Sequence, residues 1–253
     1  MNEDARIYCC ILFLCYSADS YNLSCAILKG IRRIGGNYLT VTIRLEEPKD
    51  YRIVEEITRE AFWNLYVPGA EEHYLAHTLR KHPDFIPELT FVIELDGKII
   101  GSIFYSKAKI VDAEGNEYPV ISFGPVSIAP EYHRQGYGRL LIEHSIKEAK
   151  RLGYEAIVIG GFPYHYHPYG FIGSKKYNIS MPDGKFYTGI MALPLKEGAL
   201  DNVSGHIIFS EGMYPDHDGL EAYDQTFPAK EKKVEPRQAK FEAAASQIDN
   251  NEY

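Results

Sequence analysis

Residues 121–153 read ISFGPVSIAPEYHRQGYGRLLIEHSIKEAKRLG, and this stretch decides the fold. An apolar run ends at Pro130, a short polar turn follows, and two glycines, Gly136 and Gly138, then open an amphipathic run that closes at Gly153. This pattern predicts a strand, a glycine-rich turn and a helix. Glycine has no Cβ atom to keep a ligand off the backbone, and the first amides of a helix favour an anion. The stretch therefore predicts a site for a phosphate or pyrophosphate.

The spacing of the glycines disfavours two common phosphate-binding motifs. A P-loop needs a lysine directly after its last glycine, but Arg139 follows Gly138. A dinucleotide-binding turn needs a third glycine, but this chain has Leu141 at that position. Such a turn also needs an acidic residue at the end of a second strand about 20 residues later, and no acidic residue closes the second strand here. An ordinary strand-to-helix turn stays open as the alternative to a binding site.

The runs 126–130 (VSIAP) and 133–139 (HRQGYGR) resemble motif A of the GNAT superfamily, the acetyl-CoA-dependent N-acetyltransferases. The family pattern is Gln/Arg-x-x-Gly-x-Gly/Ala, in which Gly136 and Gly138 fit, whereas His133 stands where the family has glutamine or arginine. The resemblance implies acetyl-CoA as the co-substrate. It also implies that the binding residues are Val126, Ser127, Ile128, His133, Arg134, Gln135, Gly136, Tyr137, Gly138 and Arg139.

A second segment, 160–171 (GGFPYHYHPYGF), resembles the other GNAT signature. In that signature a short helix carries a tyrosine four residues before a glycine-aromatic pair, which here places Tyr166 before Gly170. The resemblance implies that Tyr166 is the catalytic acid that protonates the departing CoA sulfur. A phenol has a pKa of about 10, so it holds its proton at neutral pH. His165 and His167 could bind a metal, but no third ligand is near in sequence, so we expect no metal site.

The fold class that we expect is α/β. Hydrophobic periodicity and turn signals predict helices at 50–66, 71–81 and 136–152 and strands at 41–45, 89–95, 98–108, 118–128, 156–159 and 187–195. Asp96-Gly97 predicts a hairpin between two of the strands. The family resemblance implies a GNAT-like mixed, mostly antiparallel sheet, flanked by helices, with a parallel splayed strand pair at 126–128 and 156–159.

We expect three parts in the chain: an N-terminal extension at 1–40, an N-acetyltransferase domain at 41–197, and an acidic C-terminal extension at 198–253. The net charge is -8, and residues 199–253 alone hold eleven acidic and five basic residues. No basic stripe is visible, so nucleic-acid binding is disfavoured. A strand at 206–209 and a helix at 237–248 are candidates within the tail, which either packs against the domain or is partly disordered.

The N-terminal extension has an unusual composition. It contains all four cysteines, Cys9, Cys10, Cys15 and Cys25, so the domain holds no disulfide framework and a reducing cytoplasm is the expected compartment. The apolar run 8–16 is too short to span a bilayer, and membrane association is disfavoured, although a membrane-surface anchor stays open. Because domain-like sequence starts abruptly at Val41, we expect residues 1–38 to be dispensable.

Two functions are compatible with these motifs. The first is an N-acetyltransferase that moves an acetyl group from acetyl-CoA by direct transfer to a primary amine, on a small molecule or a peptide. The alternative is a non-catalytic acyl-CoA-binding or sensing module of the same fold. Glu71, Glu72 and His73 on the second helix are candidates for the base, although a solvated helix face is the preferred explanation for each of them. A homodimer stays open.

Overall fold

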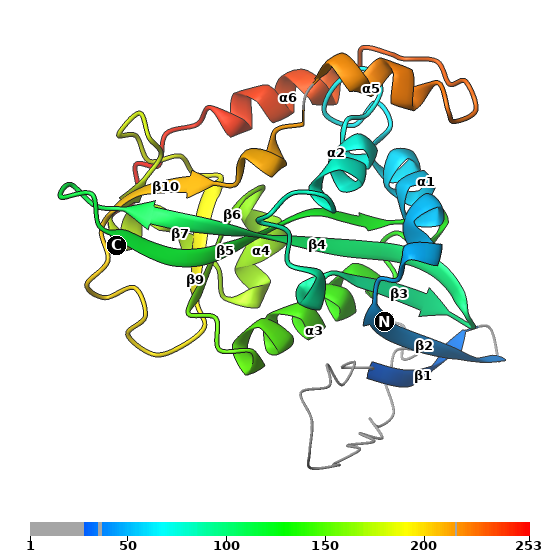
Figure 1. The fold of residues 1–253 in the computed structure, drawn as a ribbon, viewed down its shortest axis with the longest axis horizontal. Coiled ribbons are helices and arrows are strands. Elements are labelled where there is room, and N and C mark those ends of the chain that lie inside the picture. Colours follow the sequence, from blue (N-terminus) through cyan, green and yellow to red (C-terminus); the bar gives the residue numbers. More distant parts are fainter. Residues whose placement is uncertain (1–27, 35–36, 216) are drawn as a thin grey trace, which may run out of the picture.

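The computed structural model describes residues 28–34, 37–215 and 217–253. It shows a twisted sheet with helices on both of its faces (Figure 1). The strands are β1 Leu28–Ile34, β2 Asn37–Leu45, β3 Phe91–Leu95, β4 Lys98–Val111, β5 Glu117–Ile128, β6 Ala156–Gly160, β7 Ile172–Gly173, β8 Ile179–Ser180, β9 Ile190–Pro194 and β10 Gly205–Phe209. The α-helices are α1 Tyr51–Phe62, α2 Glu72–Leu79, α3 Tyr137–Arg151, α4 Pro163–Tyr166, α5 His217–Asp224 and α6 Pro236–Ala245. Short 3-10 turns occupy Pro48–Asp50, Pro87–Leu89, Pro130–Tyr132, His167–Tyr169, Ser174–Tyr177 and Glu211–Met213.

The order of strands in the sheet is β1-β2-β3-β4-β5-β6-β9-β7. Neighbours along this path are antiparallel except β5 and β6, which are parallel because helix α3 joins them. Beside this path, β10 pairs with β4, and β8 pairs in parallel with β10. The predicted mixed, mostly antiparallel sheet with a parallel pair is therefore confirmed.

The parallel pair separates soon after it forms. The register joins Ile121 to Ile157, and β6 ends at Gly160, so β6 stops before it reaches the level of Val126. Residues 126–128 pair only with β4, on the other edge of β5. The contact within the pair thus lies earlier in β5 than the predicted range 126–128, and this range lies where the two strands have already diverged.

Local turn chemistry explains where several elements end. Asp96 and Gly97 both have positive φ, of 48° and 80°, as expected for the tight turn between β3 and β4. Gly153, with φ of 90°, follows α3 and stops it. Helix α1 ends at Phe62, earlier than the predicted residue 66, because Asn64 adopts the left-handed conformation.

Two hydrophobic layers hold the sheet between its helices. Residues Tyr105 and Leu141 belong to the layer between the sheet and α3, whereas Phe104 and Leu79 belong to the layer under α1 and α2. Successive residues of β4 therefore serve opposite faces, as a pleated strand requires. The ladder between β4 and β5 shifts after Ile103, where β5 carries one extra residue.

The sheet includes more of the N-terminal part than the predicted boundary allowed. Strand β2 begins at Asn37 rather than at Val41, and β1 pairs with it from Leu28 onward. Leu28 and Leu39 pack against the core, which explains why these strands join the sheet. The four cysteines and the apolar run 8–16 lie outside the described residues.

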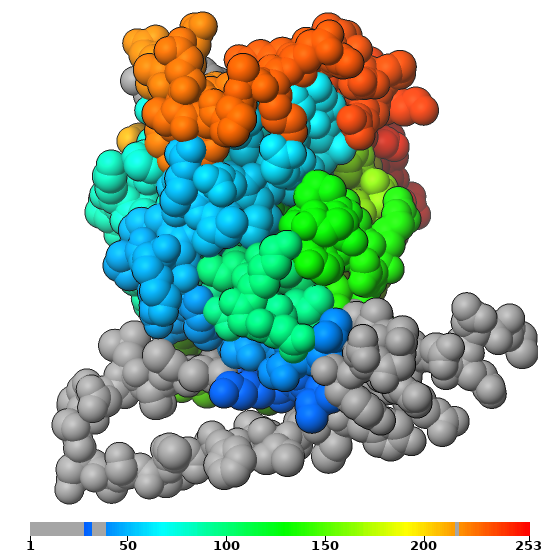
Figure 2. Space-filling model, turned by 90° about the vertical axis from the view of Figure 1, so that its right-hand side faces the viewer, coloured from blue at the N-terminus to red at the C-terminus, as the bar shows by residue number. Residues whose placement is uncertain are grey.

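The C-terminal segment packs on the domain. Strand β10 lies beside β4 in the sheet, and α5 lies over α1 and α2, where Figure 2 shows the orange segment resting on the blue and cyan atoms. Helix α6 continues toward α4, and its Phe241 packs on Phe162. Arg59 of α1 binds Asp224 at 2.6 Å, and Asn64 donates to the Glu231 carbonyl at 3.0 Å. In the described part of the chain, every helix is too short or too polar to cross a bilayer.

Candidate active site

The turn before α3 exposes backbone amides. Gly136 is the N-cap of α3 with a left-handed φ of 85°, and no side chain caps the helix there. Arg134, two residues earlier, also has positive φ, of 57°. The amides of the first helical turn therefore have no capping side chain, and together with the helix dipole they favour an anion. The predicted phosphate site at this turn is compatible with these uncapped amides.

Gly138 lies where α3 meets the end of β5. A Cβ atom at Gly138 would lie 3.6 Å from Ile128 Cγ1, which is ordinary van der Waals contact. The fold therefore tolerates a small side chain here, whereas a ligand approaching the turn would meet it. The neighbouring Tyr137 ring is fully buried, with Tyr132 edge-on at 6.1 Å. Tyr137 thus faces the site only through its backbone.

The last residues of β5 present one edge that β6 does not cover. Ala129 N–H donates to the Ile100 carbonyl of β4, and successive residues of a strand point their backbone groups to alternate edges. Val126 and Ile128 therefore direct their N–H and C=O groups away from β4, toward the gap left by β6. Ser127 Oγ lies 3.0 Å from both Thr58 Oγ1 and Ser102 Oγ, so its side chain belongs to the packing under α1.

His133 binds the last residue of the uncovered edge of β5. Its Nε2–H donates to the Ile128 carbonyl at 2.6 Å. With that donor engaged, only protonation of Nδ1 gives the imidazole a second one. The expected contact from His133 to a phosphate therefore depends on its charged form, whereas its bond to Ile128 does not.

Three polar side chains flank the turn. Arg139 binds Glu143 at 2.6 Å, but both are exposed, and such surface pairs are weak enough to exchange for a phosphate. Gln135 donates to the Glu131 carbonyl at 2.9 Å. Burial lowers the pKa of His165 on α4, and the exposed Arg134 lowers it further, so Arg134 reaches toward α4. Two arginines, Arg134 and Arg139, thus lie in the turn and in the first turn of α3.

Tyr166 lies at the point where the parallel strands diverge. Its ring packs against Phe123 of β5, with centroids 5.7 Å apart, and against Phe171 at 5.9 Å. Burial raises the pKa of this phenol, so it keeps its proton at neutral pH. A Cβ atom at Gly161 would lie 2.4 Å from Tyr166 Cε2, so glycine is required there for the ring to take this position.

The three candidates for the base differ sharply in their surroundings. His73 is fully buried and lies 3.2 Å from Asp224, and burial lowers its pKa to about 4. Its role is therefore structural. Glu72, at the start of α2, is partly buried, and burial raises its pKa to about 7. Glu72 therefore has a carboxyl pKa near neutrality, and Glu71 precedes the helix as its N-cap.

Sequence reasoning missed two aromatic residues near this region. Tyr66, which follows α1, stacks on Phe241 of α6, with ring centroids 4.1 Å apart. Nothing in the sequence relates these residues, because they belong to segments that meet only through the fold of the tail.

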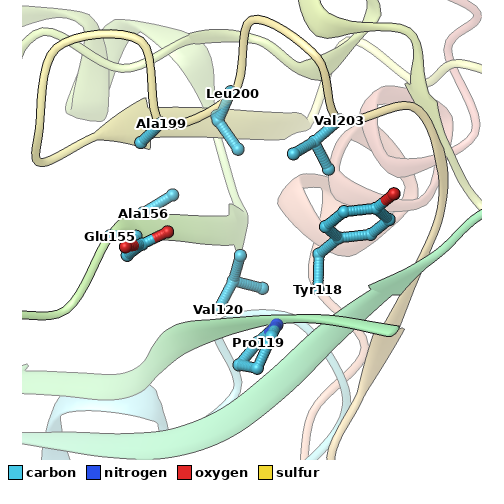
Figure 3. A pocket seen from close by; sticks show the side chains of 8 residues that line it. All are labelled: Tyr118, Pro119, Val120, Glu155, Ala156, Ala199, Leu200 and Val203. Atoms are coloured by element: carbon cyan, nitrogen blue, oxygen red, sulfur yellow. The ribbon is translucent and has the colours of Figure 1, made fainter. Parts of the chain in front are cut away.

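One surface pocket lies elsewhere, around the starts of β5 and β6. Figure 3 shows it lined by Tyr118, Pro119, Val120, Glu155, Ala156, Ala199, Leu200 and Val203. It is mostly apolar, and its one carboxylate, Glu155, binds the exposed Lys196. This pocket is at the opposite end of β5 from the glycine turn and shares no residue with it. Within the described residues, no three His, Cys, Asp or Glu side chains come together as metal ligands.

Comparison with known proteins assigns the region that contains both motifs to a family. Residues 58–167 match the acetyltransferase (GNAT) family. The chain carries a GNAT acetyltransferase domain. The matched residues of this GNAT domain run from within α1 to just beyond α4, so they include the glycine turn and Tyr166 but leave out β9, β10, α5 and α6.

Two solved structures share the fold of the GNAT domain. One is the GNAT family N-acetyltransferase YhbS from Escherichia coli in complex with CoA, 23% identical, with a TM-score of 0.60, covering 69% of this chain and 92% of that one. The other is a GNAT family acetyltransferase from Brucella melitensis in complex with acetyl-CoA, 23% identical, with a TM-score of 0.55, covering 68% and 97%. A search of curated proteins found no match.

Proposed function

We propose that this chain transfers an acetyl group from acetyl-CoA directly to a primary amine. The observation that carries the proposal is the open edge of β5 next to the uncapped amides of α3, within a GNAT domain. The two similar solved structures contain CoA or acetyl-CoA, which supports this choice of acyl donor.

The open groups match the parts of the donor molecule. The amides of the first turn of α3 would bind the pyrophosphate, and Arg134 and Arg139 would add charge-assisted hydrogen bonds. The edge at Val126 and Ile128 offers both donors and acceptors to the amides of the pantetheine arm. The Ile128 N–H would then polarise the thioester oxygen, since it points into the same gap.

Tyr166 has the properties that the departing sulfur requires. The amine nitrogen attacks the thioester carbon, a C–N bond forms and the C–S bond breaks. A thiol has a pKa of about 8.5, so the leaving sulfur gains from a proton, and the Tyr166 hydroxyl holds one at neutral pH. Transfer is direct, because no cysteine of the GNAT domain is available to carry the acetyl group.

Thiol release from acetyl-CoA in the presence of a panel of primary amines tests the proposal. We expect amine-dependent release and an acetylated product of matching mass. Calorimetry with acetyl-CoA separates the alternatives. Binding without acetylation of any amine, together with an unchanged result for Tyr166→Phe, would instead establish a non-catalytic acyl-CoA-binding module.

A further inference from the structure

The imidazole ring of His133 joins the glycine turn to the end of β5. Its Nε2 atom lies 2.6 Å from the carbonyl oxygen of Ile128. A carbonyl oxygen only accepts hydrogen bonds, so Nε2 must carry the hydrogen. In the neutral ring the other nitrogen, Nδ1, then has a lone pair and no hydrogen. The bond to the strand therefore fixes the tautomer of His133.

This tautomer decides what His133 can offer to a phosphate. Nδ1 is bonded to Cγ, so it lies nearer to the backbone of the turn than Nε2 does. The side chain is exposed, and within the part of the chain that the structure describes Nδ1 makes no hydrogen bond. Ionised phosphate oxygens only accept hydrogen bonds, so they repel the lone pair of a neutral Nδ1. Only a ring with a proton on Nδ1 can donate to a phosphate while it keeps its bond to Ile128.

The position of His133 in the motif makes this property particular to this chain. Glutamine or arginine, which the family has here, carries N–H donors at every physiological pH. Free imidazole instead changes its charge between pH 5 and 8, so its protonation near neutrality responds to a new charge nearby. A diphosphate in the turn brings two negative charges, and an opposite charge within about 4–6 Å favours a protonated imidazole.

Other ionisable groups surround the turn, and one of them is an alternative site for the proton. Carboxyl, phenol, ammonium and guanidinium groups ordinarily titrate far from pH 7, whereas a second imidazole does not. Lys98 and Glu131 also pair with each other at 3.6 Å. Burial lowers the pKa of His165, and the charge of Arg134 lowers it further. The groups are Glu131, Tyr132, Arg134 and Arg139 beside His133, Lys98 at the start of β4, and His165 on α4.

We propose that acetyl-CoA binds to this chain together with one proton, which His133 takes up on Nδ1 and donates in a hydrogen bond to the diphosphate. The charged ring then donates from both nitrogens, to Ile128 of the strand and to the ligand. This inference rests on the proposed binding of acetyl-CoA at the glycine turn, and it adds control of that binding by pH.

The sign of the pH dependence follows from the uptake of the proton. Because the charged ring binds the diphosphate better than the neutral ring, the affinity is highest at low pH and falls as the pH rises. One proton changes Kd by at most about tenfold for each pH unit. We expect acetyl-CoA to bind about tenfold more tightly at pH 6 than at pH 8.

Titration calorimetry of the full chain at pH 7 tests the inference. The protons taken up are measured from the difference in binding enthalpy between two buffers with different ionisation enthalpies, PIPES and ACES. The 3′-phosphate of CoA has its own pKa of about 6, so dephospho-CoA, which keeps the diphosphate and lacks this group, is the second probe. We expect an uptake of roughly 0.5 to 1 proton with both acetyl-CoA and dephospho-CoA.

Two variants locate the proton. His133→Gln keeps an N–H donor for Ile128 but cannot titrate, so the uptake should disappear. Its Kd for dephospho-CoA should then differ by less than about twofold between pH 6 and pH 8. His165→Gln, the matched control, removes the other imidazole near Arg134 and should keep the full uptake.

The outcomes separate this inference from the proposed function. Binding of both probes without proton uptake, or uptake that persists in His133→Gln, would overturn the inference even if amines are acetylated. Loss of the uptake in His165→Gln alone would overturn it as well. Uptake that depends on His133, without acetylation of any amine, would support the inference and overturn the transfer reaction.

Discussion

Tyr166 and Glu72 show how single side chains in one region are given different protonation properties. Both are partly buried, and burial raises the pKa of each by disfavouring the charged form. For the phenol, the result is a proton held firmly at neutral pH. For the carboxyl group, the result is a pKa of about 7, near the pH at which it can both accept and release a proton.

Replacing Tyr166 by phenylalanine should lower kcat by about 100- to 10,000-fold, because a positioned acid contributes about that factor. The change removes only the hydroxyl, so the affinity for acetyl-CoA should stay the same. Steady-state kinetics and calorimetry measure the two values. Tyr164→Phe and Tyr169→Phe are the controls. A larger loss of kcat in Tyr169→Phe than in Tyr166→Phe would show that Tyr166 is not the acid.

The raised pKa of Glu72 has a consequence for stability. The folded chain keeps this carboxyl protonated up to about pH 7, whereas its usual pKa is 4.5, so folding is penalised increasingly between these values and constantly above pH 7. Glu72→Gln should therefore raise the free energy of unfolding at pH 8 by roughly 1 to 3 kcal/mol and change little at pH 4. Over the same range kcat/KM of the unaltered chain should rise with pH through about 7, as the carboxylate ionises.

Urea titrations at both pH values measure this difference. The phenols of Tyr66 and Tyr166 stay protonated over this range, since burial raises the pKa of each. A Glu72→Gln variant that is less stable than the parent at pH 8 would contradict the prediction.

At the scale of elements, the sequence predicts the helices, strands and turns that are encoded by neighbouring residues. The glycine turn, α3 and the hairpin at Asp96-Gly97 follow from residues close together in the chain, and all are present. Two features of the site could not be predicted. The stacking of Phe241 on Tyr66 joins distant segments, and the bond from His133 to Ile128 depends on how the turn folds back. Periodicity shows which face is apolar, but it does not show which segment covers it.

Replacing Gly138 by valine should weaken acetyl-CoA binding at least about tenfold, roughly 1.4 kcal/mol. The added side chain would stand among the open amides, whereas the contact with Ile128 leaves room for a Cβ atom within the fold. Calorimetry measures the affinity. Lys147→Val introduces the same β-branched residue at an exposed position of α3 and should bind normally. Equal affinities of the two variants would place the ligand elsewhere.

The attachment of α5 to α1 gives a second prediction. Arg59 is 3% exposed and binds Asp224, which also lies beside His73. Asp224→Asn leaves a buried guanidinium without its counter-charge, so the free energy of unfolding should fall by roughly 2 to 4 kcal/mol. Chemical denaturation measures this loss, and Glu221→Gln, at an exposed position of α5, is the control. If the two variants were equally stable, the ion pair would not hold the tail.

At the scale of the whole molecule, the sheet was predictable in its centre but not at its edges. Strands β3 to β6 have strong periodicity or turn signals, whereas β7 and β8 have two residues each and give no pattern. The predicted boundaries near residues 40 and 198 lie where the amino-acid composition of the chain changes. The sheet instead includes β1 before the first boundary and β10 after the second.

Two shortened chains should therefore behave differently. A chain that starts at Leu28 keeps every described strand and should retain the melting temperature and acetyl-CoA affinity of the full chain. A chain that ends at Glu197 loses β10, α5 and α6, so it should unfold cooperatively at a much lower temperature or not fold at all. Calorimetric melting compares them. A stable, soluble chain 28–197 would show that the C-terminal segment is an appendage.

The pairing of β10 with β4 also constrains when the protein can fold. Residues of these two strands lie about 100 positions apart, with Phe209 opposite Ala108 and His206 opposite Val111. During synthesis, β4 is complete long before β10 emerges, so part of its edge waits without a partner. Contacts over such separations form slowly, and an unpaired strand edge invites association with other chains. The sheet therefore cannot be completed before residues 205–209 have emerged from the ribosome, and until then residues 108–111 of β4 present an unpaired edge on this side.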